Sequence, residues 1–184
     1  YMENKQRREL AGTIESYDDF LKTLRMEAEI DAFQPMYFDR IAQLTNKSNQ
    51  FNLTTRRYTR ADIEQMAGEP QYITLYGRLT DKFGDNGLVS VVIGEKLGDS
   101  LHIRLWLMSC RVLKRGMEQM MLDAVAERAA ADGCKELIGY YYKTAKNKMV
   151  ADLYATFGFD KIMQDGDDTV WKLNLEGYEK QGRF

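Results

Sequence analysis

At Leu113 the spacing of apolar residues changes from the period of two that is typical of strands to the period of 3.6 that is typical of helices. This change constrains the fold more than any other feature. Before it, three stretches carry apolar and β-branched residues in the pattern of strands, at residues 72–79, 88–93 and 101–108. After it, apolar residues recur at helical spacing as far as Gly133. A chain with this order places a strand–turn–helix at Ser109–Glu118, and we expect the fold to be organised around it.

The remaining segments surround this unit with further helices and strands. Strands are predicted at 26–33, 134–142, 159–163 and 169–175, helices at 37–45, 59–67 and 145–157, and a hairpin turn at the Asn-Gly of 84–87. The order β-α-α-β-β-β-α-β-α-β-β predicts an α/β (α+β) domain with a mixed, mostly antiparallel sheet flanked by helices. We expect residues 26–176 to form this domain, 1–25 a helical linker or arm, and 177–184 a C-terminal tail.

Composition narrows the classes of function. With 184 residues the chain suffices for one domain, and its formal charge of −2 gives no electrostatic reason to expect nucleic acid or a membrane surface as partner. No apolar run reaches the roughly 20 residues of a membrane helix. The polar first residues lack the pattern of a signal peptide, and two cysteines make no disulfide framework. We therefore expect a cytoplasmic protein.

The predicted turn joins a glycine to the start of a helix. The first N–H groups of a helix have no partner within it, and with the helix dipole they bind phosphate oxygens. Gly116 lets the backbone approach such a ligand, and Arg111, Lys114 and Arg115 add positive charge. The alternative is an ordinary helix start with solvated basic side chains.

A second motif lies on the next helix and just after it. Asn147, Val150 and Tyr154 are three and four residues apart and share one helix face, and Gly158 and Phe159 follow. A tyrosine held there is a candidate proton donor to a leaving thiolate. The alternative for Tyr154 is an ordinary core residue.

Together the two motifs resemble the GNAT acyltransferase superfamily. Its downstream pattern, Asn-x-x-Ala-x-x-Leu-Tyr-x-x-x-Gly-Phe, is matched by Asn147, Leu153, Tyr154, Gly158 and Phe159, with Val150 in place of alanine. Of its upstream pattern only Gly116 is matched, because Leu113 and Glu118 replace the polar residue and the second glycine.

The GNAT resemblance implies a fold and a site for an acyl thioester. The implied cofactor is coenzyme A or acetyl-CoA, or the phosphopantetheine arm of a carrier protein. Met108 would offer its backbone N–H to the thioester carbonyl. The other residues of the implied cofactor site are Arg111, Arg115, Gly116, Met117 and Asn147. Glu118 brings negative charge there, which suits the single phosphate of a carrier-bound arm better than a pyrophosphate.

Five longer strings resemble the C-terminal region of FkbH-like proteins, the glyceryl-carrier-protein synthases of haloacid dehalogenase subfamily IIIC. They are residues 40–45, 49–59, 83–87, 108–113 and 144–147, within a resemblance from about 5 to 175. This family implies transfer of a glyceryl-type group from a bisphosphoglycerate to an acyl carrier protein. It also implies a phosphatase-like N-terminal domain, whose Asp-x-Asp-x-Thr loop the sequence lacks. Tyr1 as first residue fits an excised C-terminal half.

Cys110 is the sharpest catalytic candidate. It lies at the predicted strand end, beside Arg111 and close to a helix N-terminus, and both effects favour a thiolate. We expect an acyl-accepting nucleophile there, with a small buried packing residue as the alternative. Cys134, which follows Gly133 at the start of a strand, is expected in the core.

The polar, aromatic and basic stretch 49–60 is the candidate surface for substrate or carrier. Asn49, Asn52, Arg56 and Arg57 could meet a phosphate or an acidic carrier protein. The alternative is a solvated approach to a helix capped by Thr59. His102 alternates with apolar neighbours and is expected to be structural.

Three functions stay open from sequence. The first is acyl transfer to a carrier-protein thiol, assisted by Cys110 or Tyr154. The second is a noncatalytic module that docks a carrier protein for the phosphatase-like half, and the third is a coenzyme A-dependent N-acetyltransferase. One histidine and two distant cysteines build no metal site, so no metal is expected in this domain.

Overall fold

A computed structural model of the chain describes residues 5–6, 25–113 and 116–182. The predicted arm at 1–25 lies almost wholly outside these residues, so it stays a prediction. No helix in the described part of the chain is long and apolar enough to cross a membrane.

The centre of the fold is a seven-stranded sheet in the order β1-β2-β3-β4-β5-β7-β6, counted over the described residues. The strands are β1 (Glu27–Asp31), β2 (Tyr72–Asp81), β3 (Gly84–Leu97), β4 (Ser100–Met108), β5 (Glu136–Tyr141), β6 (Asp160–Asp165) and β7 (Asp168–Asn174). Only β4 and β5 pair in parallel, and the other neighbours are antiparallel. This confirms the predicted mixed, mostly antiparallel sheet.

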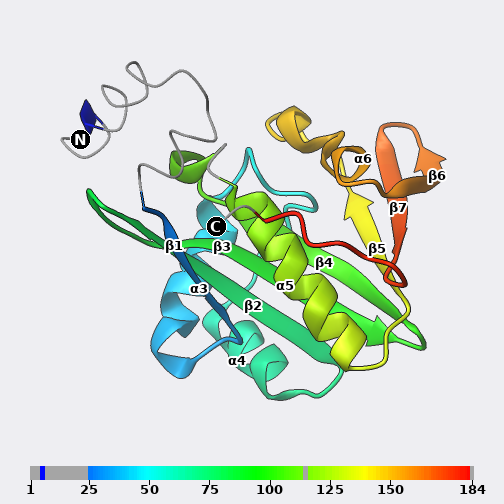
Figure 1. Cartoon of the computed structure of the whole chain (residues 1–184), viewed down its shortest axis with the longest axis horizontal. Coiled ribbons are helices and arrows are strands. Elements are labelled where there is room, and N and C mark those ends of the chain that lie inside the picture. Colours follow the sequence, from blue (N-terminus) through cyan, green and yellow to red (C-terminus); the bar gives the residue numbers. More distant parts are fainter. Residues whose placement is uncertain (1–4, 7–24, 114–115, 183–184) are drawn as a thin grey trace.

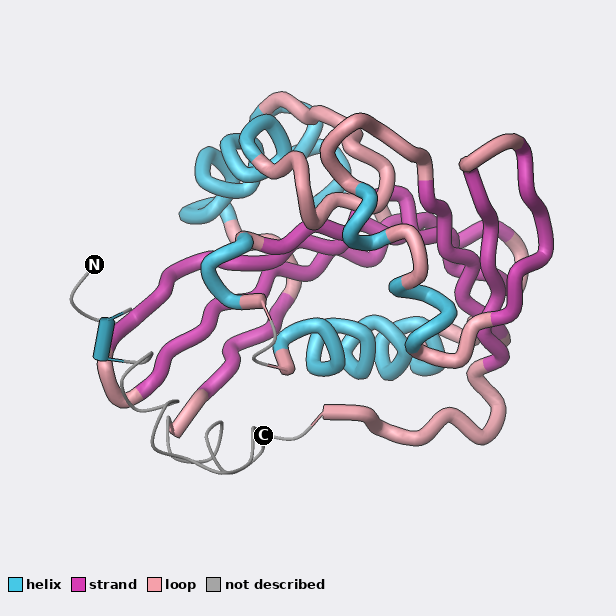
Figure 2. Tube along the Cα trace, turned by 90° about the horizontal axis from the view of Figure 1, so that it is seen from above, coloured by secondary structure: helices cyan, strands magenta, loops and turns pink. Residues whose placement is uncertain are grey.

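Helices cover both faces of the sheet (Figure 1; Figure 2). Those of the described residues are α3 (Phe38–Lys47), α4 (Arg60–Gly68), α5 (Met117–Ala131) and α6 (Leu153–Thr156), with short 3-10 turns η1 (Pro35–Tyr37), η2 (Cys110–Val112) and η3 (Lys148–Val150). Helices α3 and α4 lie on one face, and α5 lies along the other. Thr59 caps α4 as predicted, in a capping box with Asp62.

Two apolar cores follow from this layering. Under α5, the side chains of Met117, Met121 and Val125 pack on sheet residues such as Leu75 and Ile103. Under α3 and α4, a second cluster joins residues of those helices to the opposite faces of β2, β3 and β4. Burying one such side chain contributes about 1.5–3 kcal/mol, so the alternation along the strands stabilises both layers.

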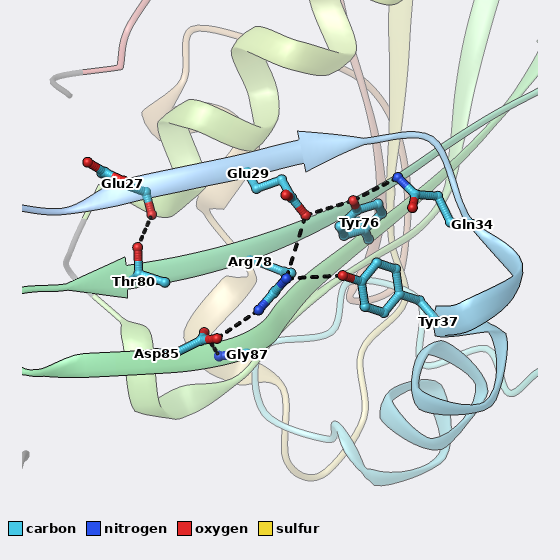
Figure 3. Close-up of polar contacts among 9 residues, drawn as sticks. All are labelled: Glu27, Glu29, Gln34, Tyr37, Tyr76, Arg78, Thr80, Asp85 and Gly87. Atoms are coloured by element: carbon cyan, nitrogen blue, oxygen red, sulfur yellow. Dashed lines mark hydrogen bonds and ion pairs between the residues drawn. The ribbon is translucent and has the colours of Figure 1, made fainter.

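A polar cluster ties β1 and η1 to the neighbouring strands (Figure 3). The buried Tyr76 hydroxyl donates to Glu29 at 2.8 Å, and Arg78 donates to the Tyr37 hydroxyl at 3.0 Å and to Asp85 at 2.7 Å. Burial, followed by the nearby carboxylate of Glu29, raises the pKa of Tyr76. The cluster therefore holds an edge strand to the sheet through contacts that exist only in the folded state.

Two local predictions were wrong. The hairpin turn lies at residues 82–83 rather than 84–87, because Asp81 Oδ1 accepts the N–H groups of Phe83 and Gly84. Residues 84–87 instead open β3, where the register shifts. The helix expected over 145–157 is divided into η3 and α6.

The described part of the tail, residues 177–182, runs along α5 (Figure 2). Asp123 on α5 accepts hydrogen bonds from the Tyr178 hydroxyl at 2.6 Å and from the Gly182 N–H at 2.7 Å. Burial, with Asp123 beside it, raises the pKa of Tyr178. The tail thus packs on the domain.

Gly139 on β5 is required by the close approach of α6. A Cβ at this position would lie 2.5–2.7 Å from atoms of the Tyr154 ring, which is rigid and enclosed. We predict that Gly139→Ala lowers the free energy of unfolding by about 1–3 kcal/mol. The matched control is Gly68→Ala, where a Cβ meets nothing within 4 Å, and where we expect a change below about 1 kcal/mol. Urea unfolding of both variants measures this, and equal stabilities would contradict the packing argument.

Candidate functional site

Strands β4 and β5 lie side by side over only part of their length. The register pairs Ser100–Ile103 with Glu136–Gly139. Beyond this point β4 continues to Met108, while the last residues of β5 pair only with β7. In the pairing of β4 with β3, Arg104 has no partner and forms a bulge. This bulge lies at the point where β4 separates from β5. The end of β4 therefore has one edge that β5 does not cover.

Residues 51–54, here called the inserted segment, occupy the space between the separated strands. Met108 donates its backbone N–H to the Phe51 carbonyl at 3.0 Å, and Leu53 donates to the Trp106 carbonyl at 3.1 Å. On the other side, the Tyr142 N–H donates to the Leu53 carbonyl at 2.9 Å. All four residues are buried, including Asn52 at 0% exposure. The segment acts as a short internal strand between β4 and the end of β5.

The buried amide of Asn147 holds the inserted segment in place. Its Nδ2 donates to the Asn52 carbonyl at 3.0 Å and to the Tyr142 carbonyl at 2.9 Å. Its Oδ1 accepts from the Thr144 N–H at 2.8 Å and from the Tyr141 hydroxyl at 3.3 Å. The side chain thus connects the inserted segment, β5 and the loop before η3.

Side chains of the inserted segment itself also hold it in place. Asn52 Nδ2 donates to the Ser48 carbonyl at 3.1 Å, and Asn52 Oδ1 accepts from the Thr55 N–H at 2.9 Å. The Thr54 hydroxyl donates to the carbonyl of the bulged Arg104 at 2.7 Å. Most polar groups of this stretch are therefore satisfied inside the protein.

These contacts correct three expectations. The Met108 N–H, expected to face a thioester carbonyl, is donated to Phe51. Asn147, expected to bind a cofactor, is 0% exposed and bonded to the chain itself. Asn52, expected at a substrate or carrier surface, is equally buried. At the edge of β4 the residues present therefore do not fit a thioester arm, because backbone of the same chain takes its place.

Tyr154 is a core residue. Its ring packs against Trp106 and Phe159, with centroid separations of 6.0 and 4.8 Å, and it covers Gly139. Its exposure is 0%, and burial raises the pKa of its hydroxyl. A proton donor must reach its substrate, so the expected catalytic role of Tyr154 is replaced by the packing role that was its alternative.

Cys110 lies where β4 ends, at the first residue of η2, and it is exposed. Its Sγ donates to Gln50 Oε1 at 3.2 Å, so the residue just before the inserted segment contacts the thiol. The alternative of a buried packing residue is wrong for Cys110. Cys134 is buried as predicted, and this burial raises the pKa of its thiol.

The strand-to-helix turn is described only in part. Gly116 caps α5 with a φ of +85°, which favours glycine, while Arg115 and Lys114 lie outside the described residues. The Met117 side chain is in the core, which leaves only its backbone N–H for an anion. Arg111 is exposed and donates to the Asn86 carbonyl at 3.1 Å.

The remaining candidates on the loop after α3 divide into two kinds. Arg57 donates to the Ser48 carbonyl at 3.0 Å and to the Thr45 carbonyl, and it also contacts Asn49 Oδ1. Arg57 and Asn49 therefore help to close the end of α3. Arg56 is exposed and lies beside Tyr58.

Sequence reasoning missed both the inserted segment and Gln50. The available signal was the spacing of Phe51 and Leu53, two apolar residues that alternate inside a polar stretch.

His102 bonds through Nδ1 to the Tyr140 hydroxyl at 2.7 Å, and burial lowers its pKa. No group of three or more His, Cys, Asp or Glu in the described ranges could hold a metal ion.

No protein-family model and no curated protein matches the chain. Solved structures do match. The ribosomal-protein-S18-alanine N-acetyltransferase from Escherichia coli superposes with a TM-score of 0.60 at 12% identity, over 81% of this chain and 94% of that one. The GNAT domain of S. lividans PAT gives 0.63 at 11% identity, over 80% and 90%. PaiA N-acetyltransferase from Thermoplasma acidophilum, in complex with coenzyme A, gives 0.56 at 16% identity, over 80% and 99%.

These likenesses show the fold, and they confirm it as the GNAT fold. The finer resemblance to FkbH-like proteins, with its phosphatase-like partner domain, stays a prediction from sequence.

The two cysteines differ enough in access to be separated chemically. We predict that Cys110 reacts with iodoacetamide at neutral pH at least about tenfold faster than Cys134, because the Cys134 thiol is buried and its pKa is raised. Peptide mass spectrometry over a time course measures both rates. Equal labelling in the folded protein would contradict the assigned exposures.

Asn147→Ala removes one amide that serves four partners. We predict a loss of about 3 kcal/mol in the free energy of unfolding, because buried carbonyl groups of Asn52 and Tyr142 lose their donor. Asn174→Ala, on the exposed end of β7, is the matched control and should change stability by less than about 0.5 kcal/mol. Similar effects in both variants would show that the amide does not hold the inserted segment.

Proposed function

We propose that this chain is an acyl-transferring domain in which the Cys110 thiol takes up an acyl group and passes it to the phosphopantetheine thiol of an acyl carrier protein. The observation that carries the proposal is the position of Cys110. It is the exposed cysteine, it lies two residues after the end of β4, and its thiol donates a hydrogen bond to Gln50. The GNAT fold, shared with acetyltransferases, supports acyl chemistry at this end of the sheet.

The reaction requires two substitutions at the acyl carbon. In the first, the Cys110 thiolate forms a C–S bond with the carbonyl carbon, and the donor's leaving group, a phosphate or a thiolate, departs with its electron pair. The thiol proton passes to solvent, which reaches the exposed sulfur. In the second, the thiolate of the carrier's arm attacks, and the bond to Cys110 breaks. Gln50 orients the sulfur only in the resting thiol, because its Oε1 is an acceptor and the proton has left once the thiolate forms.

The choice of a carrier protein as acceptor comes from the FkbH resemblance and is part of the proposal. In such proteins the donor chemistry would come from the phosphatase-like domain. Arg56 and Arg111, which are exposed on the described surface, carry the charge that suits an acidic carrier. A GNAT neighbour solved with coenzyme A supports a pantetheine arm as the kind of substrate.

Coenzyme A-dependent N-acetyltransfer is the second candidate, because the solved neighbours include N-acetyltransferases. Its mechanism needs no cysteine nucleophile. The two candidates therefore differ in what the loss of Cys110 does.

The test is to incubate the chain with an acyl-N-acetylcysteamine thioester and to measure the mass of the intact protein by mass spectrometry. We predict one acyl adduct on the wild type and on Cys134→Ala, and none on Cys110→Ala. Adding a holo-acyl carrier protein should then move the acyl group from the enzyme to the carrier. Cys134→Ala is the matched control, because it removes a cysteine that is buried.

Three results would overturn the proposal. An adduct that persists in Cys110→Ala excludes this thiol as the acceptor. Transfer from acetyl-CoA to a peptide amine at an unchanged rate in Cys110→Ala would favour the second candidate. A full-length enzyme that loads its carrier normally without Cys110 would reduce this domain to a docking module.

A further inference from the structure

The edge of β4 that β5 leaves uncovered is where a thioester arm would find unpaired backbone groups, and the inserted segment already bonds to them. The Met108 N–H and the Trp106 carbonyl are both used, at 3.0 and 3.1 Å. Across the gap the Tyr142 N–H is used as well. A ligand lying along β4 here would have to break backbone bonds on both sides.

The side chains of the inserted segment close the same space from within. Phe51 and Leu53 are 3% and 1% exposed and belong to the core under α5, where Phe51 packs on Trp106 with ring centroids 6.2 Å apart. Asn52 is locked by Asn147 from one side and by Ser48 from the other. Displacing the segment would expose two apolar side chains and leave several buried polar groups without partners.

Cys110 stays accessible in spite of this closure. It lies two residues beyond the last hydrogen bond between β4 and the inserted segment, and it is exposed. Its contact with Gln50 places the thiol at the outer end of the segment rather than behind it. An acyl group can therefore reach the sulfur from solvent while β4 stays covered.

We propose that the inserted segment is a permanent internal strand that excludes a pantetheine arm from the edge of β4, so that the arm reaches Cys110 from the outer surface. The route of the arm to Cys110 rests on the proposed function, whereas the exclusion of the arm from the edge of β4 does not. The arm has the same chemistry in coenzyme A and in a holo-carrier protein, and the experiments below use both sources.

Amide hydrogen exchange tests the closure directly. The backbone N–H groups of Leu53, Met108 and Tyr142 should be protected in the free protein. We expect their exchange rates to change less than about twofold on adding saturating acetyl-CoA or holo-carrier protein. A rise of about tenfold or more at these amides with either ligand would mean that the segment gives way, and it would overturn the proposal. The ligand that produces the rise identifies the source of the arm.

A disulfide can lock the segment and test the route to the thiol. Asn52 and Leu107 face each other in an antiparallel bridge. The flanking hydrogen bonds mark them as a non-hydrogen-bonded pair, whose Cα atoms are typically about 4.5 Å apart, within disulfide range. We therefore suggest Asn52→Cys combined with Leu107→Cys, compared in its oxidised form and after reduction by a phosphine. A phosphine is needed because thiol reductants attack thioesters.

In the locked form we expect acylation of Cys110 within about twofold of the reduced form, since the arm does not need the edge of β4. A loss of about tenfold or more that reduction restores would show that the segment must open, and the proposal would fail. Comparing two redox forms of one protein removes the effect of the substitutions. If the double variant does not fold, hydrogen exchange of the wild type decides the question.

The two proposals fail in different ways. Absence of an acyl adduct on wild-type Cys110 refutes the proposed function, whereas exchange at Leu53 and Met108 does not depend on any reaction. Repeating the exchange measurement in Cys110→Ala keeps the two readouts separate. Loss of protection in that variant on adding coenzyme A would refute the closure alone.

Discussion

The end of β4 beyond its pairing with β5 depends on its hydrogen bonds to the inserted segment. Once β4 and β5 separate, backbone groups of β4 lie inside the protein without a neighbouring strand. Leaving such a group unsatisfied costs about 1–3 kcal/mol, so something must bond to it. Here Phe51 and Leu53 of the inserted segment do so, and their side chains join the core under α5. The segment stabilises the fold and defines the candidate site at once.

Asn147 shows how one side chain makes this arrangement cooperative. Its amide bonds to the inserted segment, to the residue that follows β5 and to the loop before η3, and so adds side-chain bonds to the single backbone bond between Tyr142 and Leu53. A buried network of this kind is stabilising only when all its members are satisfied. The Asn147 amide therefore faces the chain itself, while Tyr154 fills the space over Gly139.

The fold was largely predictable from sequence because period and caps are local signals. The alternation in β2–β4, the helical spacing of α5 and the Thr59 cap all act within a few residues. The turn was misplaced at 84–87 because the Asp81 side chain accepts the N–H groups of Phe83 and Gly84 and so closes the turn at residues 82–83. The inserted segment was missed for a different reason. Its strand character comes from pairing with Met108, more than fifty residues away, and four residues are too few to show a period. Cys110 was placed near a strand end correctly, but its contact with Gln50 joins residues sixty positions apart and leaves no local signal.

A covered strand edge beside an exposed thiol has a consequence for the kind of substrate that suits the site. An arm that lies along a strand is fixed by backbone hydrogen bonds, and a small thioester can bind there unaided. An arm that meets Cys110 from outside lacks those bonds, so its recognition must come from elsewhere. A carrier protein supplies this, because docking of its own surface raises the effective concentration of the tethered thiol at the site. Under the proposed function, the inserted segment therefore favours an acyl group exchanged with a carrier protein over one delivered by a small diffusing thioester.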